Sequence, residues 1–293
     1  MVINMKYTPK FQQKRTRPVE KAWYILKPFA VYTVVKTAAM LFLAIAIPAI
    51  PVSGMAEAVE ANSNVLSATI NALAALIGVM FVMNDFMKEV ATSGEVNIDT
   101  SVIRQLGTWM KAGVKKSGDK LIPFGAVVSL GITTSLALNI LVEIFSVQST
   151  KYDTVEEIQY SVPLWLGLIF YGLISPFVEE VVFRGITYNR MKRYFGIPAC
   201  VISSSLLFGL FHANLPQFLY GTCMGVLMAL CYEWVGSFGA PLLFHMAANV
   251  FVYLFSYFCG EVQIVSLGFF MVFSLISVII LCVLYKLYKK RTE

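Results

Sequence analysis

The sequence predicts an all-α, polytopic integral membrane protein, with about eight transmembrane helices around a polar cavity inside the membrane. Of its 293 residues, 58% are hydrophobic and only 14% are charged, and the mean hydropathy is +0.71. Soluble domains carry about 25% charged residues, so this chain has too few to cover a surface that faces water. The composition excludes a soluble enzyme, a disordered protein and a nucleic-acid-binding protein, in spite of a net charge of +6.

Eight apolar segments are candidates for membrane spans. The hydrocarbon core of a bilayer is about 30 Å thick and needs about 20 apolar residues per helix. Pro48 and Pro51 favour the end of the first helix, because proline disrupts a helix interior. Windows of this size predict helices over residues 29–52, 65–84, 121–147, 162–183, 197–214, 217–235, 239–258 and 262–285.

The basic residues favour an even number of spans. Seven of the 23 Lys and Arg residues precede the first segment, six lie between the second and third, four follow the fourth and four close the chain. The loops on the opposite side carry mainly Asp and Glu, with the single Lys151 among them. Cytoplasmic loops are enriched in Lys and Arg, so we expect both termini in the cytoplasm, with a bacterial cell membrane as the location. Lys36, inside the first segment, is expected to snorkel to the cytoplasmic interface.

This pattern divides the chain into four regions. They are a basic cytoplasmic N-terminal segment (1–28), N-terminal transmembrane helices (29–158) with a cytoplasmic loop (85–120), a core (159–260), and a last transmembrane helix with a basic cytoplasmic tail (261–293). Residues 102–116 of the loop predict an amphipathic surface helix. In the core, Gly221 and Gly225 have the spacing that is typical of close helix packing.

The fourth segment ends in two glutamates and an arginine. Residues four apart share a face of a helix, whereas neighbours point about 100° apart. Glu180 and Arg184 are therefore expected to form an ion pair along one face, and Glu179 to point elsewhere without a local counter-ion. Ionisable groups inside a bilayer are costly and mark functional sites by default. An unpaired carboxylate is the better candidate for a general base.

Both histidines of the chain lie in the same half as these glutamates. The fifth segment ends in Phe208-Gly-Leu-Phe-His212, and the seventh contains His245 and Asn249 four residues apart. If the fourth helix runs on to a cytoplasmic boundary near Arg193 and the fifth begins near Ile197, Glu179 lies roughly 21 Å and His212 roughly 22 Å from that boundary at 1.5 Å per residue. His245 lies only about 10 Å beyond Gly239, so its match in depth depends on whether the turn at 235–240 is sunk into the membrane.

The three motifs EExxxR, FxxxH and HxxxN, in this order on successive hydrophobic segments, resemble those of the CAAX prenyl endopeptidase and bacteriocin-processing (CPBP, Abi) family of intramembrane proteases. The resemblance covers about residues 160–258. It implies a helical cavity in the membrane, open to the cytosol, in which peptide bonds are hydrolysed, with 159–260 as the protease core.

The resemblance also implies roles for the residues. Glu179 would be the base, with His212 helping to hold and activate the water, while His245 and Asn249 would form the oxyanion hole. Glu180, Arg184 and Phe208 would support the site. No cofactor follows with certainty; zinc is a candidate, held by Glu179, His212 and His245, since two histidines and a glutamate make an acceptable catalytic zinc set. A metal-free glutamate mechanism uses the same residues and is slightly favoured.

The expected partners are the lipid bilayer and a peptide or lipidated-protein substrate, such as a prenylated CAAX-type protein or a bacteriocin or other peptide, and no nucleic acid. A rival hypothesis is a non-proteolytic membrane scaffold or bacteriocin-immunity protein. A transporter is a weaker alternative, since broken helices and an inverted repeat are not evident in the sequence.

Overall fold

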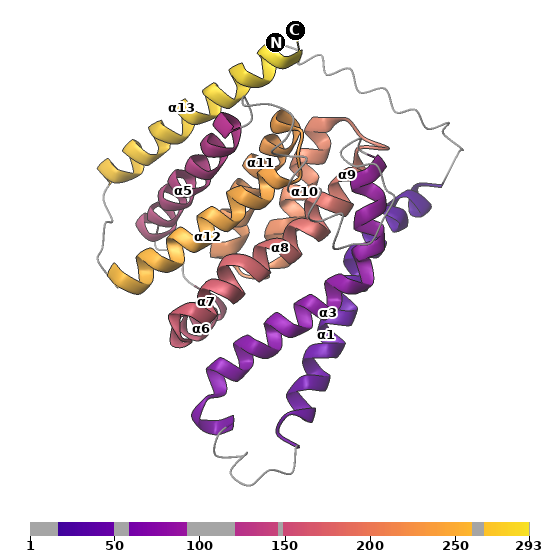
Figure 1. Cartoon of the computed structure of the whole chain (residues 1–293), viewed down its shortest axis with the longest axis vertical. Coiled ribbons are helices and arrows are strands. Elements are labelled where there is room, and N and C mark those ends of the chain that lie inside the picture. The colour runs from indigo at the N-terminus through magenta and orange to yellow at the C-terminus, as the bar shows by residue number, and fades with distance from the viewer. Residues whose placement is uncertain (1–16, 50–58, 93–120, 146–148, 260–266, 293) are drawn as a thin grey trace.

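The computed structural model describes residues 17–49, 59–92, 121–145, 149–259 and 267–292, and the elements within them are helical (Figure 1). The all-α fold is thereby confirmed. The predicted surface helix at 102–116, and most of the loop that contains it, lie outside the described residues. The helices are α1 (Pro18–Ala46), α3 (Ser63–Thr92), α5 (Leu121–Ile144), α6 (Thr150–Ser161), α7 (Leu164–Gly167), η2 (Leu168–Ile174), α8 (Ser175–Glu180), η3 (Val181–Tyr188), α9 (Asn189–Met191), α10 (Ile197–Phe211), α11 (Leu215–Val235), α12 (Gly239–Cys259) and α13 (Leu267–Thr292).

Within the described residues, seven helices are long and apolar enough to cross a membrane, one of them the continuous run of α7 to α9. The protein is thus a multi-pass membrane protein. The predicted fifth span, 197–214, is the exception, because α10 has 15 residues and extends only about 22 Å. It begins after Gly196 with a proline in its first turn. It ends where Ala213 takes a positive φ of 55° and Asn214 caps α11 by accepting a hydrogen bond from the Gln217 backbone N–H at 3.0 Å.

Two further boundaries differ from the sequence prediction. The helix α1 begins about ten residues before the predicted span, and α3 continues to Thr92, so the first part of the predicted loop 85–120 is helical. The helix α6, in the third loop, was not predicted. Its polar composition gave no span signal, and its 12 residues are too few to cross a bilayer.

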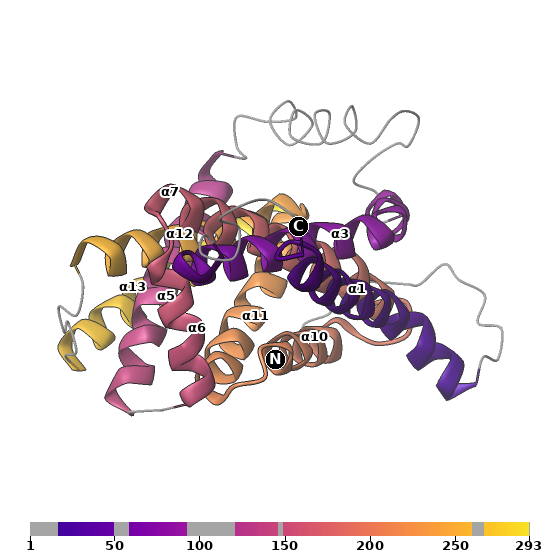
Figure 2. The same cartoon turned by 90° about the horizontal axis from the view of Figure 1, so that it is seen from below.

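The helices are arranged around a central group (Figure 1). The run α7 to α9 packs with α10 and α12, and α10 packs along α11, while α5 and α13 pair on one side and α1 and α3 pair on the other. Figure 2 shows the same arrangement from below, with α1 extending away from the rest. The central group holds the chemically interesting side chains, and the two outer pairs flank it.

Glycines let α10 and α11 approach each other closely. A β-carbon at Gly209 would lie 2.2 Å from Thr222 Oγ1, and one at Gly225 would lie 2.9 Å from Ser205 Cβ. One at Gly221 would lie 3.5 Å from Gly209 Cα. The close packing predicted from the Gly221 and Gly225 spacing is therefore confirmed, and it holds the end of α10 against the central helices.

A buried ion-pair cluster ties α3 to the end of the central run. Glu89, only 4% exposed, accepts a hydrogen bond from Arg190 Nε at 3.0 Å and pairs with Arg193. Arg190 also reaches Asp85 at 3.0 Å and donates to the Tyr24 carbonyl oxygen at 2.8 Å. Since buried charges are stable only when paired and hydrogen-bonded, this cluster fixes the ends of α1, α3 and α9 relative to one another.

Candidate active site

The two glutamates lie on a short α-helical stretch between two π-helical segments. The helix α8 has six residues and is flanked by η2 and η3. Insertions of this kind within α-helices often occur at functional sites, because they change the direction of side chains and free backbone groups from the usual bonding pattern. The pattern is not visible in the apolar sequence, so the sequence alone predicted a regular helix here.

Glu180, Arg184 and His245 form a fully packed polar network. Glu180 and Arg184 are 0% exposed, and Arg184 Nη1 donates to Glu180 Oε1 at 2.8 Å. The predicted ion pair is thus present. The same carboxylate oxygen lies 2.9 Å from His245 Nδ1. Because a carboxylate oxygen accepts, Nδ1 of His245 carries the hydrogen in this bond, which leaves Nε2 to face the other glutamate.

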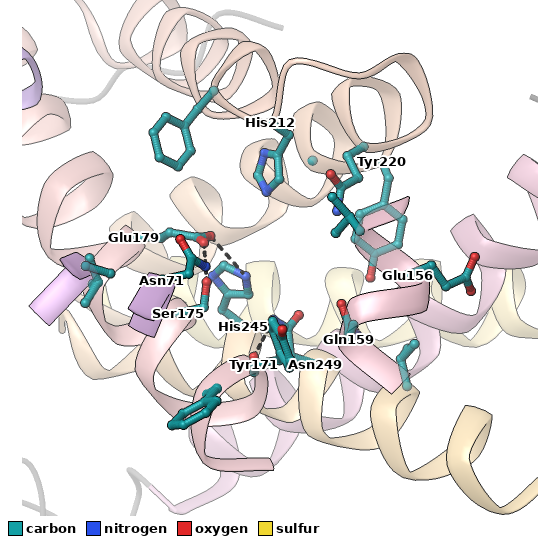
Figure 3. Close-up of a pocket in the computed structure, with 18 of the residues that line it drawn as sticks. Asn71, Glu156, Gln159, Tyr171, Ser175, Glu179, His212, Tyr220, His245 and Asn249 are labelled. Carbon is teal, nitrogen blue, oxygen red and sulfur yellow. Dashed lines mark hydrogen bonds and ion pairs between the residues drawn. The ribbon is translucent and has the colours of Figure 1, made fainter. Parts of the chain in front are cut away.

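Glu179 points away from this pair, as predicted, and toward the second ring nitrogen of His245 (Figure 3). Its Oε1 accepts a hydrogen bond from Ser175 Oγ at 2.6 Å. Its Oε2 lies 3.8 Å from His245 Nε2, which is too far for a direct hydrogen bond. Ser175 was not foreseen as a site residue, although its position four residues before Glu179 is a signal that the sequence contained.

His212 is the C-terminal cap of α10 and is held by its own turn. Its Nδ1 lies 3.0 Å from the Phe208 carbonyl oxygen, and since that oxygen can only accept, Nδ1 carries the hydrogen and Nε2 has the free lone pair. The Phe208 ring packs edge-on against both imidazoles, with centroids 5.1 Å from His212 and 5.6 Å from His245. On its face lies the Arg184 guanidinium at 4.4 Å, a cation–π contact.

Asn249 shares a face of α12 with His245 and is oriented by the backbone of η2. Its Nδ2 donates to the Tyr171 carbonyl oxygen at 3.0 Å. An amide NH₂ group has two hydrogens, so this bond uses one and leaves the second for another acceptor. Figure 3 shows Asn249 beside His245 at the same side of the cavity.

The turn before α12 is anchored by one buried ring. Gly236 takes a left-handed φ of 69° and ends α11, and Phe238 is 0% exposed with its ring 4.9 Å from that of Phe86. Gly236 itself is exposed. The helix α12 that follows places His245 against both glutamates, while the depth of the turn in the membrane stays a prediction.

These side chains line a cavity of about 360 Å³, within the usual range for ligand pockets. Five of the seven predicted residues line it, whereas Glu180 and Arg184 lie behind it. The five are Glu179, Phe208, His212, His245 and Asn249.

Part of the cavity wall comes from helices outside the predicted core. Tyr32 and Lys36 of α1, Asn71 of α3 and Glu156 of α6 all line it. Lys36 thus faces the cavity, which corrects the expectation that it snorkels to the cytoplasmic interface. Its only sequence signal was a lone charge in an apolar segment. Burial raises the pKa of Glu156, with smaller contributions from the charges of Asp153 and Glu143.

A metal at the site stays a prediction. Among the described residues, no three His, Cys, Asp or Glu side chains are placed together to hold a metal ion. His245 Nδ1 bonds to Glu180 at 2.9 Å and His212 Nδ1 to a backbone carbonyl at 3.0 Å, which leaves Nε2 of each ring available, as in histidines that bind a metal. The mechanism below uses Glu179, His212 and His245 without a metal.

Comparisons with known proteins point to the same segment. Residues 161–251 match the family described as type II CAAX prenyl endopeptidase, Rce1-like. The chain is 26% identical over 238 residues to YdiL of Bacillus subtilis, named as a membrane peptidase; the match covers 78% of this chain and 86% of YdiL. It is 28% identical over 141 residues to the membrane-embedded CAAX protease MroQ of Staphylococcus aureus, over 46% of this chain and 56% of MroQ.

No solved structure matches the chain significantly. The family match nonetheless contains every residue of the network described above, from Glu179 to Asn249. The resemblance noted in the sequence is therefore confirmed: residues 161–251 of this membrane protein are similar to the Rce1-like CAAX prenyl endopeptidase family.

Proposed function

We propose that the protein is an intramembrane endopeptidase of the CAAX type, which hydrolyses a peptide bond in the cavity between α8, α10 and α12. The observation that carries this proposal is the placement of Glu179. It is a buried carboxylate at a cavity wall, oriented by Ser175 at 2.6 Å and separated by 3.8 Å from a histidine nitrogen with a free lone pair. A positioned carboxylate beside such a gap is suited to take a proton from a water molecule.

In the proposed reaction Glu179 is the general base. It takes a proton from water as the water oxygen adds to the carbonyl carbon of the scissile bond. The His212 Nε2 lone pair accepts a hydrogen bond from the same water and holds it. The proton then passes to the leaving amine as the C–N bond breaks, which gives a carboxylate and an amine as products.

The charge that develops on the carbonyl oxygen needs donors. The second amide hydrogen of Asn249 is one, and its direction is set by the bond to Tyr171 at 3.0 Å. His245 donates through Nδ1 to Glu180 and, in the tautomer with a free lone pair on Nε2, has no second hydrogen to give, so Asn249 is the proposed oxyanion donor. Glu180 and Arg184 position His245 and do not touch the substrate. Preorganised donors of this kind account for about 10²–10³-fold of rate each.

The proposed substrates are peptides or lipidated protein C-termini, in keeping with the names of the family and of the two relatives. Both termini are proposed to lie on the cytoplasmic side. Three contacts support placing both termini on the same side: Tyr24 near the N-terminus with Arg190, Lys192 with Glu233 at 2.7 Å, and Trp234 with Tyr285 near the C-terminus, with ring centroids 5.5 Å apart. The Lys and Arg residues near both termini favour the cytoplasmic side.

The test compares wild type with Glu179→Gln in lipid nanodiscs, using a fluorogenic prenyl-cysteine peptide. The substitution keeps the shape and removes the base, so cleavage should fall about 10²–10⁴-fold. Glu157→Gln, a carboxylate of α6 that does not line the cavity, is the matched control and should cleave normally. Cleavage should also persist in a strong chelator. Equal rates for wild type and Glu179→Gln would disprove the assignment of the base.

A further inference from the structure

The wall of the cavity carries a lysine from α1. Of the described residues that line it, Lys36 is the sole Lys or Arg. No ion pair found within the described part of the chain includes Lys36. A charged group inside a membrane protein is costly and marks a functional site by default. Its neighbours show what kind of ligand it is placed to meet.

Lys36 lies on the wall that also carries the proposed catalytic groups. It shares a face of α1 with Tyr32, four residues earlier. Its Nζ lies 5.8 Å from the centre of the Phe211 ring, and Tyr32 packs on the same ring at 6.2 Å. Phe211 in turn packs against the His212 ring, with centroids 6.0 Å apart. Lys36 is thus one aromatic ring away from His212 and lines the same cavity.

Lys36 and Glu179 line the same cavity, yet within the described part of the chain the two side chains do not form an ion pair. If Lys36 served only to neutralise Glu179, a direct contact would be expected, like the one between Arg184 and Glu180 at 2.8 Å. The ammonium group therefore keeps hydrogen-bonding capacity that protein side chains do not use. A peptide that enters the cavity is the natural source of the missing acceptor.

We propose that Lys36 binds a carboxylate of the peptide substrate and makes the enzyme select for an acidic group close to the scissile bond. This inference rests on the proposed function. The carboxylate is either the C-terminus of the substrate or the side chain of an Asp or Glu. An ammonium group pairs with either, as a point charge with three donors.

The experiment uses three forms of one fluorogenic prenyl-cysteine peptide: a free C-terminal acid, its C-terminal amide, and the amide with an Asp in the last position. Cleavage by wild type is measured together with binding to Glu179→Gln protein by fluorescence anisotropy. Wild type should favour the acid over the amide about 10- to 100-fold, the gain typical of a hydrogen bond to a charged group. Preference for the Asp amide instead would identify the side-chain carboxylate as the ligand.

Substitutions of the lysine identify its role. Lys36→Met should abolish the preference, chiefly through KM, and Lys36→Arg should retain much of it. Lys27→Met, an exposed lysine of α1 outside the cavity wall, is the control and should leave the preference unchanged.

The outcomes separate this inference from the proposed function. If no peptide is cleaved but binding to the Glu179→Gln protein still depends on the carboxylate and on Lys36, the binding role stands and the endopeptidase assignment fails. If peptides are cleaved with equal efficiency whatever their charge, or if Lys36→Met keeps the preference, the role of Lys36 is refuted. Absence of both binding and cleavage for all three peptides also counts against it.

Discussion

Removing Arg184 should destabilise the protein by about 3–5 kcal/mol, because the change leaves a buried carboxylate without its cationic partner. Arg184 and Glu180 are both 0% exposed and lie 2.8 Å apart. Arg184→Met keeps an unbranched side chain but removes the guanidinium, and with it the contact to the Phe208 ring, so Glu180 retains only its bond to His245. Solvent cannot reach the carboxylate to compensate for the loss.

The assay is equilibrium unfolding in mixed micelles, followed by tryptophan fluorescence or by steric trapping. A second variant, Glu180→Leu combined with Arg184→Met, removes both charges. It should recover part of the loss, since replacing both partners of a buried ion pair by apolar side chains is often neutral. Glu179→Gln serves as the comparison and should change the free energy of unfolding by about 1 kcal/mol or less, as an exchange that keeps volume and hydrogen bonding. A loss below about 1 kcal/mol for Arg184→Met, or a double variant less stable than the single one, would refute this account of the network.

Three further predictions concern packing, orientation and pH. Gly225→Val should lower the free energy of unfolding by about 1–3 kcal/mol, since a β-carbon there lies 2.9 Å from α10, whereas Gly125→Ala, with no atom within 4 Å, should be neutral or slightly stabilising; equal midpoints would argue against close packing. Ser175→Ala should lower kcat about 10- to 100-fold with little change in KM, because Glu179 loses the hydrogen bond that orients it, and an unchanged kcat would exclude this role. Burial and acidic neighbours raise the pKa of Glu156 above its ordinary 4.5. The protonated side chain therefore contributes its full stability below pH 4.5, and this contribution is lost as the pH rises through the raised pKa. Between pH 4.5 and the raised pKa the melting temperature of wild type should fall relative to that of Glu156→Gln, and parallel curves would show that another group is responsible.

Much of the candidate site could be predicted because its signals are local. The spacing of Glu180 and Arg184 places them on one face of any helix, and the same holds for His245 and Asn249. Rare ionisable residues in an apolar chain stand out without a structure, since each is costly in a membrane. The motifs also follow one another on successive segments, which made the family recognisable.

The predicted boundaries and number of membrane spans agree less well with the structure, and α10 shows why. The apolar run over 197–214 has the hydropathy of a membrane span, but the helix has only 15 residues. Its apolar side chains are instead partly buried against α11, which packs closely along it through glycines. Hydropathy measures whether a segment avoids water, and burial against another helix satisfies this as well as lipid does. The separate helix α6 was missed because a polar, amphipathic segment carries no hydropathy signal.

The all-helical membrane fold and five residues of the cavity wall could be predicted from the sequence, because composition and the spacing of residues along one helix can be read from the order of residues in the chain. The contact between Ser175 and Glu179 has the same helical spacing and was within reach of the sequence. Two features required the packing of distant segments: His245 reaches both glutamates because α12 lies against α8, and Lys36 lines the cavity because Phe211 of α10 lies next to Tyr32 and Lys36 of α1. The spacing of residues along one segment does not show which other segment it packs against, so these two contacts could not be predicted.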